Sequence, residues 1–348
     1  KAPIYYQQQT LGAPPAVGQD GRLIYWNNNT GAAANLLNNG LRPNSWNVNG
    51  VVTNGDARFN RNRTFNDAII AKRTNKGESQ QLTVGLNKPF NDTDWAWAAS
   101  YTYTNANEVS PLTSSTSSSQ LGNTSIFQAN EAVNSTSSYE IKNRFLATAQ
   151  WKHAFFGDND TMVSMVYEGR SGRPYSYNFD NDANGDGRLN DLLYMPKGPG
   201  DVVFGSPAEE AAFWSFVAND DYLNTHRGQV AERNAAHGPW VNQFDLQVSQ
   251  EFPGFWKGHK AELTLDILNI GNLIDKDWGR VEEVSFPAMR GVVEYGGICG
   301  AGGAPLTGVC AGNAGKYVYR VNTPDNLTVY DDKGISRWAA QISVRYKF

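Results

Sequence analysis

The residues best suited to binding chemistry lie in one stretch, DNDANGDGRLND, at residues 180–191. Oxygen-bearing side chains stand at its first, third and fifth positions, glycine at the sixth and an acid at the twelfth. Oxygens at this spacing converge on a hard cation, and Gly185 permits the sharp turn that this requires. The pattern predicts a Ca²⁺ site on an exposed loop, with Asp180, Asp182, Asn184, Asp186 (through its backbone carbonyl) and Asp191 as ligands.

A second interpretation of this stretch stays open. Asp191 replaces the glutamate that usually ends a helix-flanked calcium loop, as it does in dockerin-type loops. The sequence also predicts no pair of helices on either side of the stretch. A simple cluster of Asx and glycine turns has the same composition. If calcium binds, we expect it to make the loop rigid rather than to take part in catalysis.

Cys299 and Cys310 are the two cysteines of the chain, and both lie in a glycine-rich stretch. Their spacing predicts one disulfide, formed in an oxidising compartment. A zinc site would need further ligands nearby, and no histidine lies close in sequence. Residues 292–295 and 317–320 are predicted to pair as a hairpin whose tip this disulfide cross-links.

The other polar residues form no catalytic set. The histidines at 153, 226, 237 and 259 are scattered, and no Ser-His-Asp arrangement or pair of catalytic carboxylates emerges from the spacing. We therefore predict that the protein is not an enzyme. A formal net charge of -4 and the absence of basic runs argue against a nucleic-acid partner.

The elements that position these residues are predicted to be strands with one apolar and one polar face. The clearest is residues 335–348, ISRWAAQISVRYKF, where apolar residues from Trp338 to Phe348 alternate with polar ones. No run of 18 apolar residues occurs, so a membrane-spanning helix is excluded. The same alternation predicts six further strands, at about 68–90, 95–107, 139–156, 161–170, 240–252 and 260–270.

Such strands fit two architectures. In a soluble sandwich the apolar face meets a core, whereas in an outer-membrane barrel it meets lipid and the polar face lines the lumen. Short predicted turns near residues 91, 157 and 254 alternate with long connections at about 108–138, 171–238 and 271–335. Because outer-membrane barrels have short periplasmic turns and long extracellular loops, the alternation favours the barrel. It also predicts a periplasmic carboxy terminus and an extracellular Cys299–Cys310 loop.

The long connections have their own character. Residues 110–138 are rich in Ser, Thr and Asn, and we expect them to be too polar to pack a core. Ser206-Pro207-Ala208-Glu209 predicts the start of a short helix, with serine as the N-cap and proline in the first turn. Residues 1–66 read as an extracellular loop region that follows a truncated strand at Ile4-Tyr5-Tyr6, and residues 67–348 as barrel strands with long loops.

Several segments, taken in order, resemble the carboxy-terminal part of TonB-dependent outer-membrane receptors of the Oar-like group. They are GRSGRPYS (169–176) leading into DNDANGDGRLNDLLYMP, then Arg233-Asn234, 240–251, LTLDILNIGNLIDKDWG (263–279) and the terminal ISVRYKF. Each motif alone is weak, but their order is specific. The terminal aromatic residue, Phe348, resembles the signal that the outer-membrane insertion machinery reads.

The resemblance implies an all-β, transmembrane antiparallel barrel of 22 strands, closed by an amino-terminal plug that contacts the energy-coupling protein TonB. The sequence accounts for the last seven or eight of these strands and contains neither plug nor TonB box, so we expect a fragment of a longer protein. The function implied is an outer-membrane transporter or receptor, of which this part forms wall, lumen and substrate-facing loops. The alternative is a non-transport adhesion or structural barrel whose extracellular loops bind ligands.

Overall fold

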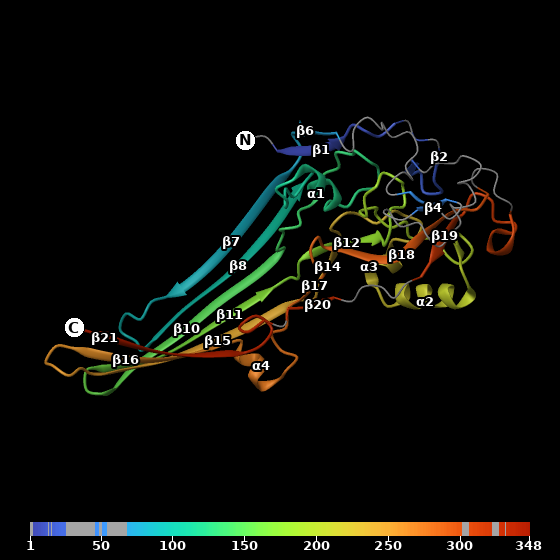
Figure 1. Cartoon of the computed structure of the whole chain (residues 1–348). Helices are drawn as coiled ribbons and strands as arrows, with labels where there is room; N and C mark the ends of the chain where they lie inside the picture. Colours follow the sequence, from blue (N-terminus) through green and yellow to red (C-terminus); the bar gives the residue numbers. More distant parts are fainter. Residues whose placement is uncertain are drawn as a thin grey trace.

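The computed structural model describes residues 3–12, 14, 16–25, 46–48, 51–53, 68–300, 306–321, 327–330 and 332–348. It is mostly antiparallel β-sheet with a few short helices, which confirms the predicted all-β class. A long, curved sheet occupies one end of the molecule, and the long connections gather at the other end (Figure 1).

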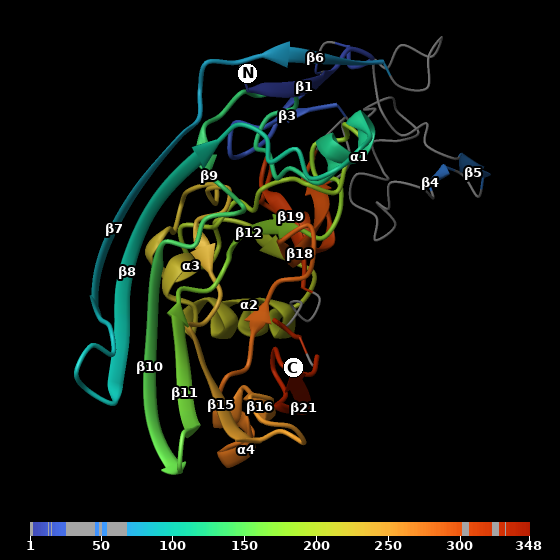
Figure 2. The ribbon, with the colours of Figure 1, turned by 90° about the vertical axis from the view of Figure 1, so that its left-hand side faces the viewer.

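The curved sheet, which we call the large sheet, has the strand order β21-β16-β15-β11-β10-β8-β7, with the short β9 pairing beside β8. Each long strand pairs antiparallel with the next long strand along the chain. Among the described residues β7 and β21 have no second partner, so the sheet is open at both edges (Figure 2). Its strands are β7 (Glu78–Lys88), β8 (Trp95–Glu108), β9 (Ser135–Thr136), β10 (Asn143–Phe156), β11 (Asn159–Arg170), β15 (Val241–Pro253), β16 (Lys260–Leu268) and β21 (Ala339–Lys347).

The apolar residues of neighbouring strands lie in register on one face. One row runs through Val163, Val248, Leu265 and Ile342, which are successive cross-strand partners. Alternation along each strand therefore becomes a continuous apolar band across the sheet. This face is exposed: Trp97, Phe145, Leu265 and Ile342 expose 42, 44, 36 and 71% of their surface.

The opposite face carries cross-strand polar contacts. Arg144 Nε donates to Glu168 Oε1 at 2.7 Å, and Gln247 Nε2 donates to Asp266 Oδ1 at 2.6 Å. The hydroxyls of Thr83 and Thr102 lie 2.9 Å apart. Polar side chains on this face therefore satisfy one another across strands.

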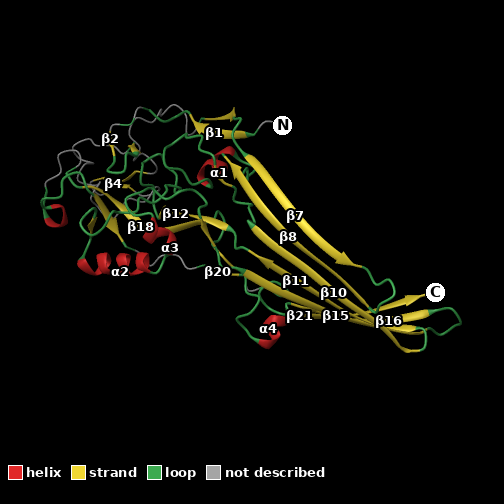
Figure 3. Cartoon of the chain, turned by 180° about the vertical axis from the view of Figure 1, so that it is seen from behind, coloured by secondary structure: helices red, strands yellow, loops and turns green. Residues whose placement is uncertain are grey.

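Connection lengths alternate as the sequence predicted. Residues 89–94, 157–158 and 254–259 are short turns at one end of the large sheet, and 109–142, 171–240 and 269–338 are long connections at the other (Figure 3). The predicted strand 68–90 is two strands, β6 (Ile69–Arg73) and β7, and two other strands begin later than predicted, at Asn143 and Ala339. The delay before β21 has a local cause, since the amides of Ser336 and Arg337 both donate to the Asp332 carbonyl in a turn.

The long connections pack into a second unit, which we call the headpiece. Its sheet has the order β13-β19-β18-β12-β14, and the predicted hairpin is present as β18 and β19. The predicted helix is also present, with Ser206 as its N-cap. The elements are β12 (Pro174–Phe179), β13 (Val203–Phe204), α2 (Pro207–Ala218), α3 (Asp221–Thr225), β14 (Ala236–His237), β18 (Met289–Ile298), the 3₁₀ turn Gly308–Cys310 and β19 (Tyr317–Arg320).

Aromatic side chains build the headpiece core. Phe179, Phe213 and Tyr319 are almost fully buried and meet edge to face, with Phe179 and Tyr319 ring centroids 5.6 Å apart. Buried apolar area is the main stabilising contribution here, and the ring geometry adds to it. The headpiece is therefore a packed unit rather than a set of independent loops.

Small elements complete the described chain. The strand predicted at Ile4–Tyr6 is β1, paired with β6. Within the predicted loop region 1–66, residues 1–2, 13, 15, 26–45, 49–50 and 54–66 lie outside the described residues. The bounds are β1 (Ile4–Gln8), β2 (Ala16–Val17), β3 (Leu23–Ile24), β4 (Trp46–Val48), β5 (Val51–Thr53), β6 (Ile69–Arg73), α1 (Ser117–Gly122), α4 (Ile270–Ile274), β17 (Glu282–Glu283) and β20 (Thr328–Val329).

The connection 110–138 adds no side chain to the core clusters of the described residues, which agrees with its polar composition. It nevertheless packs through polar side chains, since Gln120 is buried near Val109 and Ile126. Gln120 accepts from the Ser114 amide at 3.0 Å and donates to Ser110 Oγ at 2.9 Å. A polar side chain whose hydrogen bonds are satisfied in this way can be buried at little cost.

Candidate functional site

The predicted calcium loop, residues 180–191, follows β12 in the centre of the headpiece. The Asp180 amide donates to the Val293 carbonyl of β18 at 2.9 Å, which fixes the start of the loop. β18 comes very close at this point, since a Cβ placed on Gly291 would lie 1.4 Å from Asp180 Oδ1. A side chain at 291 would therefore displace the Asp180 carboxylate from its position in this structure. We call residues 180–191 the acidic loop.

Side-chain oxygens and backbone amides of the acidic loop bond to one another. Asp182 accepts from the amides of Gly185 and Gly187 at 2.6 Å each, with Gly185 at φ 81°. Asn184 Oδ1 accepts from the Asp186 amide at 2.7 Å, and Asp191 Oδ2 accepts from the Ala183 amide at 2.8 Å. These contacts wind the chain into the tight turn that the sequence predicted.

The acidic loop is buried rather than exposed as predicted. Asp182, Asn184, Asp186 and Asp191 expose at most 2% of their surface, because strands and loops of the headpiece surround them. Burial raises the pKa of Asp191 to about 7, although the Arg22 charge opposes the shift. Burial, together with the negative charge of Asp186, also raises the pKa of Asp182 well above its usual value.

Arg22 is the cation that meets this loop. Its guanidinium donates to Asp191 Oδ1 at 2.7 Å and to the Leu192 carbonyl, and it lies 3.3 Å from Asp20 Oδ2. The same group lies over the rings of Phe127 and Phe179, 5.2 and 5.3 Å from their centroids. Arg22 is fully buried, so an ion pair ties the amino-terminal segment to the acidic loop.

The five predicted ligands share one loop. Among the described residues no group of three or more His, Cys, Asp or Glu side chains is arranged to hold a metal ion. The oxygens of Asp182 and Asp191 bond to loop amides and to Arg22. Calcium binding stays a prediction, for which the carboxylates supply suitable donors.

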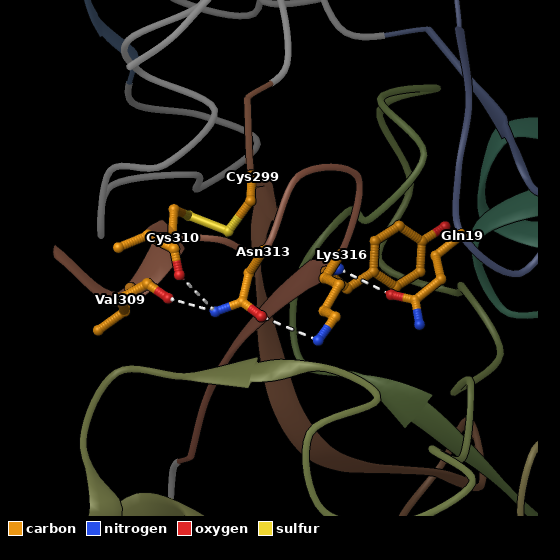
Figure 4. Close-up of a disulfide and its surroundings, with 8 residues drawn as sticks. Gln19, Cys299, Val309, Cys310, Asn313 and Lys316 are labelled. Atoms are coloured by element: carbon orange, nitrogen blue, oxygen red, sulfur yellow. Dashed lines mark hydrogen bonds between the residues drawn. A yellow bond between two sulfur atoms is a disulfide. The ribbon is translucent and has the colours of Figure 1, made fainter. Parts of the chain in front are cut away.

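The predicted disulfide joins Cys299, after β18, to Cys310, ahead of β19, with their Cα atoms 5.3 Å apart (Figure 4). Asn313 and Lys316 support the same turn, and Lys316 Nζ donates to Asn313 Oδ1 at 2.8 Å. The next amide, that of Tyr317, donates to Gln19 Oε1 at 2.8 Å. The cross-linked tip is thereby joined to the amino-terminal segment that also carries Arg22.

A cavity of about 210 Å³ lies where the large sheet gives way to the headpiece, and we call it the junction cavity. Segments from all three long connections line it. Arginine and glutamate stand beside aromatic and proline side chains: its lining includes Tyr139, Arg173, Arg233, Glu283, Phe286 and Tyr330.

The charges of the junction cavity are unevenly paired. Glu283 Oε2 lies 3.6 Å from Arg173 Nε, and Glu283 Oε1 lies 3.6 Å from Arg170. Arg233 is 6% exposed and donates through Nη2 to the carbonyls of Glu108 and Val133. Among the described residues its Nε has no hydrogen-bond partner. Burial lowers the pKa of Arg233.

Sequence reasoning missed both Arg22 and the junction cavity. Arg22 stands in a glycine-flanked turn that reads as an ordinary surface loop, and its partner Asp191 is 169 residues away. The Arg233-Asn234 dipeptide was noted as a motif, but its neighbours in space come from other connections. Only contact information between distant segments would have found either.

Comparison with known proteins adds no relative. The chain matches no family model, no curated protein and no solved structure. Among the described residues, no helix has the length and apolarity needed to cross a membrane.

Proposed function

We propose that this chain forms the carboxy-terminal wall, lumen face and outer loops of a TonB-dependent transporter or receptor in the Gram-negative outer membrane. The observation that carries the proposal is the exposed, in-register apolar band on one face of the large sheet. Val344 and Leu86, near opposite edges, expose 75 and 68% of their surface. Exposure of an apolar face of this extent to water is unfavourable, whereas contact with lipid hydrocarbon is not.

Aromatic residues at the short-turn end support the same interpretation. Trp95 and Trp151 lie together, with ring centroids 6.4 Å apart, and Phe255 stacks on Tyr346 at 5.7 Å. Trp256 in the same turn exposes 67% of its surface. Amphipathic rings gather at the boundary between headgroups and hydrocarbon in outer-membrane barrels.

The open edges of the large sheet argue for further strands. Unpaired strand edges cannot be left in hydrocarbon, because each backbone amide or carbonyl without a partner costs several kcal/mol. A longer barrel supplies the missing partners for β7 and β21. The resemblance to Oar-like receptors gives that barrel 22 strands and a plug, through which TonB acts. Phe348, 96% exposed at the end of the chain, is the residue that the insertion machinery would read.

A matched pair of substitutions tests the placement in the membrane. Leu265 faces the apolar side of β16 and Thr264 faces the other side, and both pair with the same neighbouring strands. Leu265→Arg should lower the free energy of unfolding in lipid vesicles by about 2–4 kcal/mol, and Thr264→Arg should lower it by much less. Equal effects of the two substitutions would contradict the placement.

Contact with TonB separates transport from adhesion. In the native cell, in vivo cross-linking should capture the full-length protein together with TonB, and loss of the proton gradient should reduce ligand uptake. An adhesion or structural barrel would give neither result. If the protein is correctly inserted in the outer membrane and no cross-link to TonB forms, the transport proposal is contradicted.

The acidic loop is proposed as a Ca²⁺ site that makes the headpiece rigid. Support comes from three buried acids of the loop, Asp182, Asp186 and Asp191, which expose at most 2% of their surface. Removing calcium with a chelator should increase proteolysis within residues 171–238. Cleavage at the same rate with and without chelator would contradict the assignment.

A further inference from the structure

We propose that the junction cavity binds the carboxylate of a small ligand that has an apolar body. The binding of this ligand does not depend on the proposed function. A role of the cavity in a substrate path rests on the transporter proposed above. The first argument is the arginine that the fold leaves incompletely paired. Arg233 is buried, yet the described structure offers its guanidinium only two backbone carbonyls, and its Nε has no partner. Burying a charge this way is costly unless an anion completes the site.

The nearest acids do not supply that anion. Both oxygens of the Glu131 carboxylate accept backbone amides, those of Phe127 and Gln128. Glu108 Oε1 accepts from the Ser138 amide at 2.9 Å. These carboxylates hold their own loops in place, and they influence Arg233 through charge without bonding to it. The guanidinium therefore keeps a positive charge at the cavity wall that no carboxylate of the described residues bonds.

A second arginine at the cavity supplies a matching donor. Arg173 is half exposed, with 59% of its side chain accessible, and its only ion-pair partner among the described residues is Glu283 at 3.6 Å. That distance exceeds a direct hydrogen bond, and Glu283 is shared with Arg170. A ligand carboxylate is able to take forked hydrogen bonds from a guanidinium of this kind. Two arginines against one glutamate give the lining a net positive charge.

The rest of the lining selects the body of the ligand. Tyr139 and Phe286 expose 64 and 66% of their surface and line the cavity together with Pro174, Pro287 and Val284. Neutral polar residues, among them Thr113, Asn123 and Ser138, complete the lining. Apolar walls combined with polar groups that orient the ligand are typical of sites for small organic ligands. At about 210 Å³ the cavity is smaller than the usual drug-sized site, so the ligand is about as large as one amino-acid residue. The geometry points to an aromatic or aliphatic monocarboxylate, free or as the last residue of a peptide.

The test compares a carboxylic acid with the corresponding neutral amide. Binding of N-acetyl-phenylalanine and of N-acetyl-phenylalaninamide to the full-length protein in detergent micelles is measured by calorimetry. The acid should bind at least tenfold more tightly than the amide. Arg173→Gln should weaken the acid at least tenfold and leave the amide unchanged, and Arg345→Gln, an exposed arginine on the large sheet, should change neither. A tetrapeptide ending in phenylalanine, with a free or amidated end, then distinguishes a peptide terminus from a free acid.

Three results of these binding experiments would overturn the proposal, and a fourth comes from a variant of Arg233. The three are equal binding of acid and amide, an unaltered acid affinity in Arg173→Gln, or inorganic phosphate displacing the acid at equal concentration. Arg233→Met serves as a second variant, with circular dichroism and hydrogen exchange of residues 108–133 showing whether the loop is still folded. A folded Arg233→Met that binds the acid as well as the wild type also contradicts the proposal. If the protein cross-links to TonB but does not bind the acid, the ligand proposal is refuted and the transporter proposal is not.

Discussion

Replacing Arg22 by methionine removes the cation that joins the amino-terminal segment to the acidic loop. Methionine keeps much of the length and apolar packing over Phe127 and Phe179, so the change isolates the charge and its hydrogen bonds. The side chains of Arg22, Asp20 and Asp191 each expose 1% or less. In the variant two buried acids lose their partner in a region with no access to water.

The expected cost follows from that burial. Removing one member of a buried ion pair typically costs about 3–5 kcal/mol, because the remaining charge is left uncompensated. The contacts to Leu192 and to the two rings are part of the same cost and are not added to it. A loss of this size corresponds to an increase of about a hundredfold to several thousandfold in local opening.

Native-state hydrogen exchange measures this opening directly. The reporter amides are those of Leu192 and Leu193, which donate to Ile126 and Tyr177 in the headpiece. Their exchange should accelerate by the factor above, while amides in β16 of the large sheet stay unchanged. Chelator is present throughout, so that a bound cation cannot replace the lost charge.

Two comparisons make the Arg22 result interpretable. Arg345→Met, which removes an arginine with 73% side-chain exposure lying 3.9 Å from Glu262, should change stability by less than about 1 kcal/mol. Adding Asp191→Asn to Arg22→Met should recover part of the lost local stability, because it removes the buried Asp191 charge that no longer has a cation partner. Acceleration below about fivefold at Leu192 and Leu193, which is under about 1 kcal/mol, would refute the reasoning.

Three further predictions concern the headpiece. Gly291→Ala should displace the Asp180 carboxylate, because a Cβ would lie 1.4 Å from Asp180 Oδ1, and faster proteolysis of residues 171–238 would report the resulting loosening of the acidic loop. Cys299→Ser with Cys310→Ser should cost about 2–3 kcal/mol of local stability through the entropy of the opened loop, seen as faster exchange at the Lys316 amide; unchanged exchange would contradict this. Ser206→Ala should cost about 1 kcal/mol by removing the N-cap of α2, and an unaltered exchange rate in that helix would argue against the cap.

Strand alternation made the large sheet predictable. In the strands that alternation predicted, the apolar residues Trp97, Phe145, Leu265 and Ile342 lie on the exposed face of the structure. A period of two residues fixes which side chains share a face, and short turns fix which strands are neighbours. The Cys299–Cys310 disulfide was also readable, because the chain has no other cysteine with which either residue could pair.

The headpiece was less predictable because its contacts join distant segments. The acidic loop was recognised from its spacing, yet its burial depends on Arg22 and Ile126, which come from distant segments. The parallel pairing of β12 with β18 likewise links residues more than a hundred positions apart. No local period encodes such pairings, so the sequence did not show that polar side chains of residues 110–138 are buried.

Spin labels along the last strand test the central claim, that the apolar face of the large sheet meets lipid. Labels are placed one at a time at residues 340–345 of the full-length protein in lipid vesicles, and their accessibility to oxygen and to a water-soluble nickel complex is compared. We predict that labels at Ala340, Ile342 and Val344 favour oxygen, whereas those at Gln341, Ser343 and Arg345 do not. Equal accessibility at all six positions, or nickel preferred at Ile342 and Val344, would contradict a lipid-facing sheet.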